Sequence, residues 1–160
     1  MNQSESYESE IADRVDEKMA HVKMCQEVWG VGVMNILVVD RERADRKKLV
    51  KMLKKQKKGS EIFAVEDDDG GYESALEHDL DVAFIDMSPN FSDVCEYGLL
   101  LTKKLKEIFS VINIIFLSKE ADNSIAIEGY RMHVSGYIVK PVTMERLEEE
   151  FLNLNYPIEE

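Results

Sequence analysis

Five short apolar segments, each followed by a stretch with helical hydrophobic spacing, restrict the fold of this 160-residue chain more than any other feature. Continuous apolar runs are typical of strands that are buried on both faces, as in parallel sheets covered by helices. The expected strands are residues 35–40, 62–65, 81–86, 112–117 and 136–139. The expected helices are residues 43–57, 72–78, 98–109, 122–133 and 144–153, with a turn at Asp68 to Gly71. Because strands and helices alternate with short connections, the sequence predicts an α/β fold with a doubly wound, five-stranded parallel sheet.

Composition and charge argue against several classes of protein. The formal net charge is −12, from 20 Lys and Arg against 32 Asp and Glu. Nucleic acids are bound by neutralising phosphates with basic side chains, so we expect no direct nucleic-acid partner. No apolar run approaches the roughly 20 residues of a membrane span, and the acidic start of the chain is unlike a secretory signal. Cys25 and Cys95 lack metal-ligand spacing, so we expect free thiols in a cytoplasmic protein without membrane contact.

The charges are unevenly distributed along the chain. Residues 41–58 hold ten Lys and Arg and two acids, whereas residues 61–86 hold ten acids and no Lys or Arg. A basic helix of this kind is most simply a solvated face or a docking surface for an acidic partner. A DNA-binding helix is the less favoured alternative.

Polar side chains stand at the ends of four of the five expected strands. They are Asp40, Asp86, Ser118 and Lys140, after the first, third, fourth and fifth strands. In doubly wound sheets the functional groups gather beyond the carboxyl ends of the strands, so we expect these side chains to share a pocket. A carboxylate that captures a phosphoryl group needs neighbours that offset its charge. Lys140 would supply a cation, Ser118 a hydroxyl, and the acids would hold a divalent ion, so the set predicts phosphoryl capture.

Other kinds of site have less support. A nucleotide-binding fold would need a Ser-, Thr- or Gly-rich phosphate loop after the first strand, where this chain has Arg41 to Ala44. A three-histidine metal site is disfavoured because His21, His78 and His133 lie on separate expected elements.

Four segments resemble the landmark segments of two-component response-regulator receiver domains. They are NILVVD (35–40), VAFID (82–86), NIIFLS (113–118) and VSGYIVKPVT (134–143). The resemblance runs from Met34 to about residue 157 and is greatest to the receivers of bacterial regulators of the transcription-activator type. It implies a flavodoxin-like sheet with strand order 2-1-3-4-5 and a receiver domain at 34–157. Since the sequence stops at Glu160, we expect no output domain.

The resemblance also implies roles by position. Asp86 matches the phosphoacceptor, Ser118 the switch hydroxyl, and Lys140 the lysine that binds the phosphoryl group. Tyr137 stands where an aromatic side chain reports the switch. The bond between Lys140 and Pro141 matches one that is usually cis in the family, which would aim the lysine inward.

Magnesium is the cofactor that the resemblance implies, held by Asp40, Asp86 and the backbone carbonyl of Ser88. The second acid of the family's metal-binding pair is replaced by Arg41, which cannot ligate a cation and would compete with magnesium for Asp86. Glu42 is displaced by one residue, which changes its direction as well as its reach. Two further departures are a longer loop after Asp86, which reaches its glycine about four residues late, and large side chains, Lys119 and Glu120, after Ser118.

Two functions therefore stay open. In the first, a stand-alone receiver accepts a phosphoryl group on Asp86 from a histidine kinase or phosphotransfer protein and switches its contacts with a downstream protein partner, or with a second copy in a homodimer. It is then not an enzyme beyond self-phosphorylation and self-dephosphorylation. In the second, Arg41 pairs with Asp86, no magnesium binds, and this pseudo-receiver is a constitutive protein-interaction module.

Residues 1–33 lie outside the resemblance. Ile11, Val15, Met19 and Val22 recur at helical spacing, which predicts an N-terminal helical extension. The extension either packs on the domain or serves self-association or partner binding, and an accidental pattern in a disordered leader is the remaining alternative.

Overall fold

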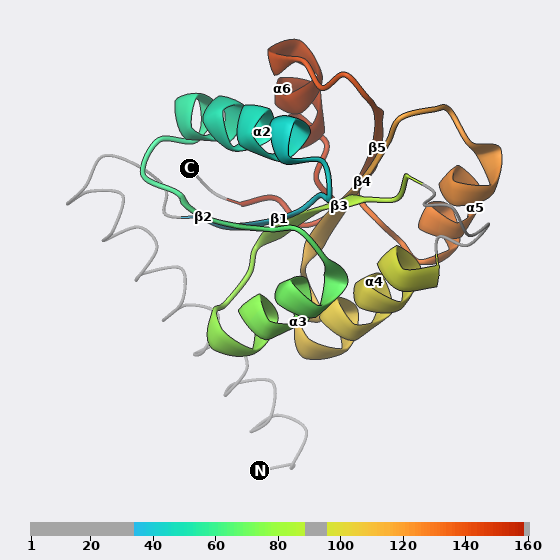
Figure 1. Cartoon of the computed structure of the whole chain (residues 1–160). Coiled ribbons are helices and arrows are strands. Elements are labelled where there is room, and N and C mark those ends of the chain that lie inside the picture. Colours follow the sequence, from blue (N-terminus) through green and yellow to red (C-terminus); the bar gives the residue numbers. More distant parts are fainter. Residues whose placement is uncertain (1–33, 89–95, 159–160) are drawn as a thin grey trace, which may run out of the picture. The chain divides into compact units, whose positions relative to one another are not determined.

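The computed structural model describes residues 34–88 and 96–158, and strands and helices alternate along them (Figure 1). The strands are β1 (Asn35–Val39), β2 (Glu61–Val65), β3 (Val82–Asp86), β4 (Asn113–Ser118) and β5 (Gly136–Val139). The helices are α2 (Arg43–Gln56), α3 (Asp68–Glu77), α4 (Glu96–Ile108), α5 (Asn123–Arg131) and α6 (Met144–Leu152). The N-terminal helix expected in residues 1–33, and both cysteines, lie outside the described residues. No helix in the described part of the chain has the length and apolar character needed to cross a membrane.

The strands form one parallel sheet in the order β2-β1-β3-β4-β5, which confirms the order that the resemblance implies. In the register, Val39 of β1 lies opposite Ile85 of β3, and Asp86 lies opposite Leu117 of β4. Since all strands run in one direction, the residues that follow β1, β3, β4 and β5 meet at one edge of the sheet.

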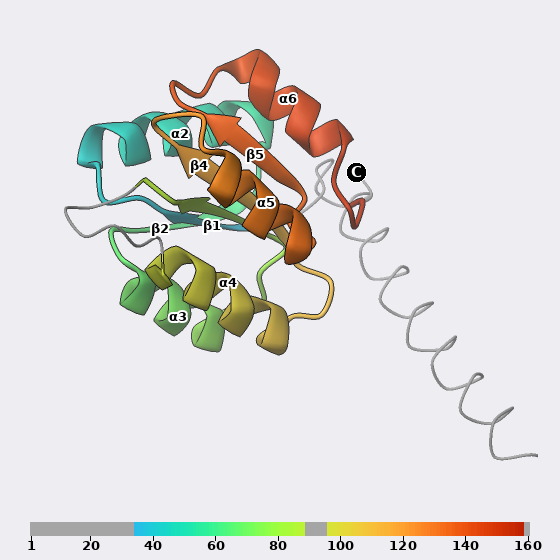
Figure 2. The ribbon, with the colours of Figure 1, turned by 90° about the vertical axis from the view of Figure 1, so that its right-hand side faces the viewer.

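Helices cover both faces of the sheet (Figures 1 and 2). Alternate strand residues face opposite sides, so each apolar strand contributes to two cores. One core joins β1 to α2 and α6, and it includes Ile36, Val38, Leu49, Leu53 and Leu147. The other joins β1 to α3, α4 and α5, and it includes Leu37, Val39, Ala75, Leu101 and Ile125. This two-sided burial is why the strand sequences are continuously apolar.

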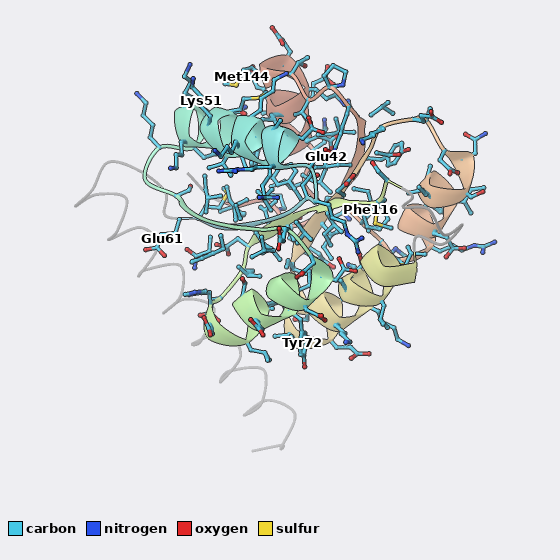
Figure 3. All side chains as sticks on the ribbon, in the orientation of Figure 1. Glu42, Lys51, Glu61, Tyr72, Phe116 and Met144 are labelled. Atoms are coloured by element: carbon cyan, nitrogen blue, oxygen red, sulfur yellow. The ribbon has the colours of Figure 1, made fainter. Side chains whose placement is uncertain are left out.

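The basic helix α2 turns its lysines toward solvent. Its buried residues are Leu49 and Leu53, whereas Lys51 is exposed and points away from the helix (Figure 3). The basic stretch is therefore a solvated face in the folded domain, and only its first turn approaches the edge of the sheet described above.

The prediction of a turn between two elements at Asp68 to Gly71 is wrong, because these residues are helical and begin α3. The helix starts there because the carboxylate of Asp67 accepts a hydrogen bond from the backbone N–H of Gly70 at 2.8 Å. The negative charges of Asp68 and Asp69 also favour this end of the helix dipole, which offsets the cost of two glycines. Gly71 permits close packing, since an added Cβ would lie 3.0 Å from Leu101.

The last helix is fixed to the strand before it by a charged contact. Thr143 caps α6, as expected, by accepting from the N–H of Arg146 at 3.2 Å. The guanidinium of Arg146 donates to the carbonyl of Tyr137 at 3.0 Å and pairs with Glu150 at 2.7 Å. Burial raises the pKa of Glu150, and the positive charge of Arg146 acts against that rise. These contacts hold α6 against β5.

Replacing Phe84 with alanine tests the core on the side of α2 and α6. Phe84 is fully buried and meets Phe151 edge-on, with ring centroids 6.1 Å apart. We expect the free energy of unfolding to fall by about 3–5 kcal/mol, as measured by urea denaturation. Leu152→Ala is the control, because that side chain is 79% exposed and its loss should change the value by less than about 0.5 kcal/mol. Equal effects of the two substitutions would contradict this description of the core.

Candidate functional site

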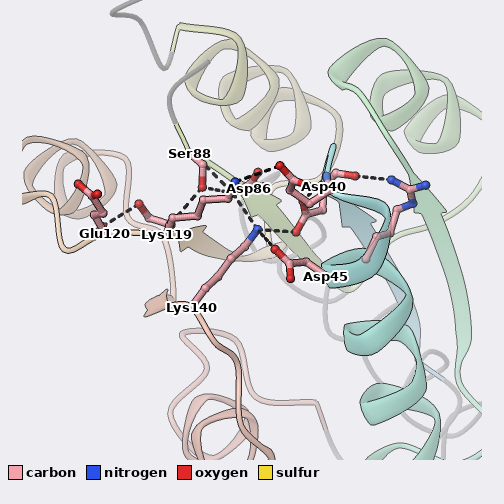
Figure 4. Close-up of polar contacts among 10 residues, drawn as sticks. Asp40, Asp45, Asp86, Ser88, Lys119, Glu120 and Lys140 are labelled. Atoms are coloured by element: carbon pink, nitrogen blue, oxygen red, sulfur yellow. Dashed lines mark hydrogen bonds and ion pairs between the residues drawn. The ribbon is translucent and has the colours of Figure 1, made fainter. Parts of the chain in front are cut away.

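Three of the four polar side chains expected at the strand ends are in direct contact. The Lys140 ammonium lies 2.8 Å from Asp40 Oδ2 and 3.4 Å from Asp86 Oδ1 (Figure 4). The fourth residue, Ser118, accepts a backbone hydrogen bond from Lys140 at 2.7 Å, but its own hydroxyl donates to the carbonyl of Glu120 at 2.8 Å. The sheet therefore brings the expected residues together, with the Ser118 hydroxyl engaged by the loop after β4.

A third carboxylate, Asp45, joins this cluster. It lies in the first turn of α2, and its Oδ2 is 3.1 Å from the Lys140 ammonium. The sequence analysis did not include it, although the first turn of a helix that directly follows β1 must lie at this edge. The side chains of Lys140, Asp40 and Asp86 are only 8%, 1% and 8% exposed, so solvent screens these charges weakly.

Burial and mutual charge shift the pKa values of the cluster. Burial is the largest influence on Asp40 and raises its pKa; the hydrogen bond from Lys140 opposes this rise, and the nearby charge of Asp86 adds to it. Burial favours the neutral form of Lys140, but the hydrogen bond to Asp40 and the charge of Asp86 outweigh it and raise the pKa of Lys140. The lysine therefore stays protonated at neutral pH and offsets part of the negative charge of the three carboxylates around it.

Ser88 holds Asp86 by its side chain. The Ser88 hydroxyl donates to Asp86 Oδ1 at 2.7 Å, and the backbone N–H of Ser88 donates to the same oxygen at 3.2 Å. The hydroxyl oxygen also accepts from the backbone N–H of Lys119 at 3.1 Å. The resemblance implied a role only for the backbone carbonyl of Ser88. The hydrogen bond from its hydroxyl to Asp86 could have been predicted from the sequence, because a serine stands two residues after the aspartate.

The two residues assigned to the switch share one hydrogen-bond acceptor. The hydroxyls of Ser118 and Tyr137 both donate to the carbonyl of Glu120, at 2.8 Å and 3.0 Å. The Tyr137 hydroxyl in turn accepts from the backbone N–H of Asp122, the N-cap of α5. The peptide bond between Lys140 and Pro141 is cis, as the resemblance implies.

In the part of the chain that the structure describes, neither Arg41 nor Glu42, the two residues that depart from the family pattern after β1, pairs with Asp86. Within the described residues Arg41 makes no ion pair, and it lines a shallow pocket together with Asp86 and the acidic residues at the start of α3. Burial raises the pKa of Asp68 in that pocket, and the charge of Arg41 opposes this rise. Glu42 pairs with Lys119 at 3.0 Å. The pairing of Arg41 with Asp86 that the pseudo-receiver hypothesis supposes is therefore not found, because Lys140 takes that place.

The donor groups at this edge do not fit a resident magnesium ion. Asp40 uses one oxygen to accept from the backbone N–H of Glu42 at 2.9 Å and the other to bind Lys140 at 2.8 Å. Arg41 brings positive charge where a further acidic ligand would be needed. Across residues 34–88 and 96–158, no three His, Cys, Asp or Glu side chains are grouped so that they could hold a metal ion.

The fold and this cluster of carboxylates around a lysine define a doubly wound α/β domain with a candidate acceptor aspartate at the end of β3. Residues 36–152 match the response regulator receiver domain family, and the chain belongs to that family. It is thus a receiver domain of two-component signalling, and receiver domains are signalling domains.

Similar proteins agree with this assignment. The sensory transduction protein LytR of Staphylococcus haemolyticus is 28% identical over 125 residues, which cover 78% of this chain and 46% of LytR. The chain therefore spans about half the length of that curated relative. Chemotaxis protein CheY4 of Vibrio cholerae has a TM-score of 0.62 at 22% identity, covering 73% of this chain and 94% of CheY4. A Burkholderia pseudomallei response regulator, solved with a phosphorylated aspartic acid, a calcium ion and citrate, has a TM-score of 0.63 at 19% identity, covering 73% of this chain and 65% of that chain. At these identities the two structures show the fold.

Replacing Lys140 with methionine removes the charge at the centre of the cluster. Asp40, Asp45 and Asp86 then lack this cation, so the pKa of Asp40 rises further above 3.8. The folded state then holds more protons than the unfolded state at mildly acidic pH, and its stability falls as the pH rises toward neutrality. We expect a loss of about 3–5 kcal/mol at neutral pH in urea denaturation.

The free energy of unfolding at alkaline pH provides a second check on the same variant. In the wild-type protein the raised pKa of Lys140 contributes stability below pH 10.5, and this contribution disappears as the pH rises through the higher folded-state pKa. The variant should lack this alkaline loss. Lys55→Met, at an exposed position on α2, is the matched control and should follow the wild-type profile. A Lys140→Met profile parallel to wild type would argue against the buried cluster.

Proposed function

We propose that this receiver accepts a phosphoryl group on Asp86 from a histidine kinase or a phosphotransfer protein. The observation that carries the proposal is the setting of the Asp86 carboxylate, which lies at the end of β3 with Lys140 3.4 Å away. Both hydrogen bonds from Ser88 go to Oδ1, and the Lys140 ammonium lies nearest the same oxygen, so among the described contacts Oδ2 is the oxygen available to attack phosphorus. Asp86 also lines the small pocket that it shares with Arg41, so the carboxylate borders a hollow beside the start of α3.

The chemistry of the step needs only a nucleophilic oxygen and nearby positive charge. Oδ2 of Asp86 forms a bond to phosphorus while the bond between phosphorus and the donor's leaving atom breaks, and the electron pair of that bond leaves with the donor. The product is an acyl phosphate on Asp86. Lys140 is already protonated beside the carboxylate, so it is available to stabilise charge on the transferred oxygens.

The hydrogen bonds of Glu120 connect this step to the surface of the domain. A phosphoryl group at Asp86 offers new acceptor oxygens to the Ser118 hydroxyl, which now donates to the Glu120 carbonyl. Tyr137 donates to that same carbonyl, so the loop after β4, strand β5 and the start of α5 respond together. We propose that the face formed by α5, β5 and α6 thereby changes its contacts with a downstream protein partner, or with a second copy of the chain.

Intact-mass measurement after incubation with acetyl phosphate tests the acceptor. We expect the wild-type protein to gain the mass of one phosphoryl group and Asp86→Asn to gain none, because the substitution removes the attacking carboxylate. Asp45→Asn is the matched control, since Asp45 contacts the same lysine but is not the proposed nucleophile, and it should still be labelled. Labelling of Asp86→Asn at the wild-type level would refute the assignment.

The phosphorylation-independent pseudo-receiver is the second candidate function, and the observation in its favour is Arg41 in place of a metal-binding acid. In that case three carboxylates permanently hold Lys140, and the surface of the domain is constitutively ready for a partner. The same mass measurement separates the two candidates, because this one requires that the wild-type protein gains no mass with or without magnesium.

A further inference from the structure

Lys119 and Glu42 form an ion pair that spans the end of β3. Lys119 directly follows β4 and Glu42 lies between β1 and α2, while β3 is the strand between β1 and β4 in the sheet. The Lys119 ammonium is 3.0 Å from Glu42 Oε1. The pair therefore joins the two loops on either side of Asp86, and the Lys119 side chain runs toward that residue (Figure 4).

Two contacts connect Lys119 to the acceptor carboxylate. Its backbone N–H donates to the Ser88 hydroxyl at 3.1 Å, and that hydroxyl donates to Asp86 at 2.7 Å. The hydrogen bond and charge of Glu42 raise the pKa of Lys119, the positive charge of Lys140 acts against this rise, and the charge of Asp86 makes a smaller contribution in favour of it. Lys119 is thus a protonated amine whose backbone is linked to Asp86 through the Ser88 hydroxyl.

A phosphoryl group at Asp86 would require more positive charge than Lys140 alone supplies. Such a group carries about two negative charges near neutral pH. Lys140 is already shared among Asp40, Asp45 and Asp86, and the acids at this edge do not fit a resident divalent ion. Arg41 is less suited to the role, because its charge acts on Asp68 at the start of α3. Among the residues that the structure describes, Lys119 is a further cation linked to Asp86, through the Ser88 hydroxyl.

We infer that Lys119 is a second cationic ligand of the phosphoryl group on Asp86, and that Glu42 is its counter-ion in the unphosphorylated protein. The inference rests on the proposed function and adds to it a residue and a charge balance. On phosphorylation the ammonium exchanges its contact with Glu42 for a phosphoryl oxygen. Because both cations then belong to the chain itself, acceptance of the phosphoryl group depends only weakly on an added divalent ion.

The test compares initial rates of acetyl phosphate labelling at constant ionic strength, once with EDTA and once with magnesium. The variants are Lys119→Met, the charge-conserving Lys119→Arg, and Lys55→Met as an exposed lysine in the last turn of α2, at the opposite end of that helix from Asp45. In EDTA we expect labelling of Lys119→Met to be slower than wild type by about tenfold or more, because one stabilising cation is lost. Lys119→Arg and Lys55→Met should stay within about threefold of wild type, and magnesium should accelerate wild type by less than about threefold.

Folding is checked separately by the urea midpoint. The Lys119 side chain is 54% exposed, so we expect the same midpoint for Lys119→Met as for wild type. A shifted midpoint with normal labelling would assign Lys119 a structural role only and overturn the inference.

The remaining outcomes distinguish this inference from the proposed function. If wild type and Lys119→Met are labelled at equal rates, Lys119 does not contact the phosphoryl group, while the acceptor role of Asp86 stands. Faster labelling of Lys119→Met would make the side chain an obstruction and also overturn the inference. If wild type is labelled only when magnesium is present, the cations of the chain do not suffice and the inference about Lys119 is overturned. If wild type is labelled under neither condition, both that inference and the proposed phosphorylation of Asp86 are overturned.

Discussion

The ammonium group of Lys140 is the interaction on which the arrangement at the carboxyl edge of the sheet depends. It lies 2.8 Å from Asp40 and 3.4 Å from Asp86, at the ends of β1 and β3, although the lysine itself follows β5. The side chain thus reaches past β4 to the two central strands. Two buried carboxylates without a cation would repel each other, and burial of an unpaired charge costs several kcal/mol. The lysine makes their proximity possible and thereby fixes the position of Asp86.

The exchange of an acid for Arg41 changes how charge is balanced around this centre. An acidic pair after β1 is suited to a divalent ion, whereas arginine at the second position repels one. In this chain the carboxylates instead bind ammonium groups: Asp40 and Asp86 bind Lys140, and Glu42 binds Lys119. Ammonium groups of the protein itself therefore offset part of the negative charge at this edge of the sheet. The described counter-charges of these carboxylates are side chains of the protein, on a fold that the family shares.

Much of the fold could be predicted from the sequence, because continuous apolar runs indicate strands buried on both faces and alternating strands and helices indicate a parallel sheet. Asp86 and Lys140 were predicted to meet because all strands of a parallel sheet end at the same edge. The start of α3 at Asp68 was missed, because two glycines indicate a turn unless the preceding cap is recognised. The hydroxyl bond of Ser118 to a loop carbonyl and the contact of Lys119 with a residue 77 positions earlier depend on rotamers and loop paths. Neither periodicity nor strand order specifies those.

The attachment of α6 to β5 has a mechanical consequence. Arg146 of α6 donates to the carbonyl of Tyr137 in β5, and its ion pair with the buried carboxylate of Glu150, one turn further along the same helix, holds the guanidinium in that position. Lys140 follows that same strand directly. Phosphorylation of Asp86, as proposed above, would displace Lys140 and, through β5, shift the outer surface of α6. A protein bound there would sense the state of a carboxylate that it never touches.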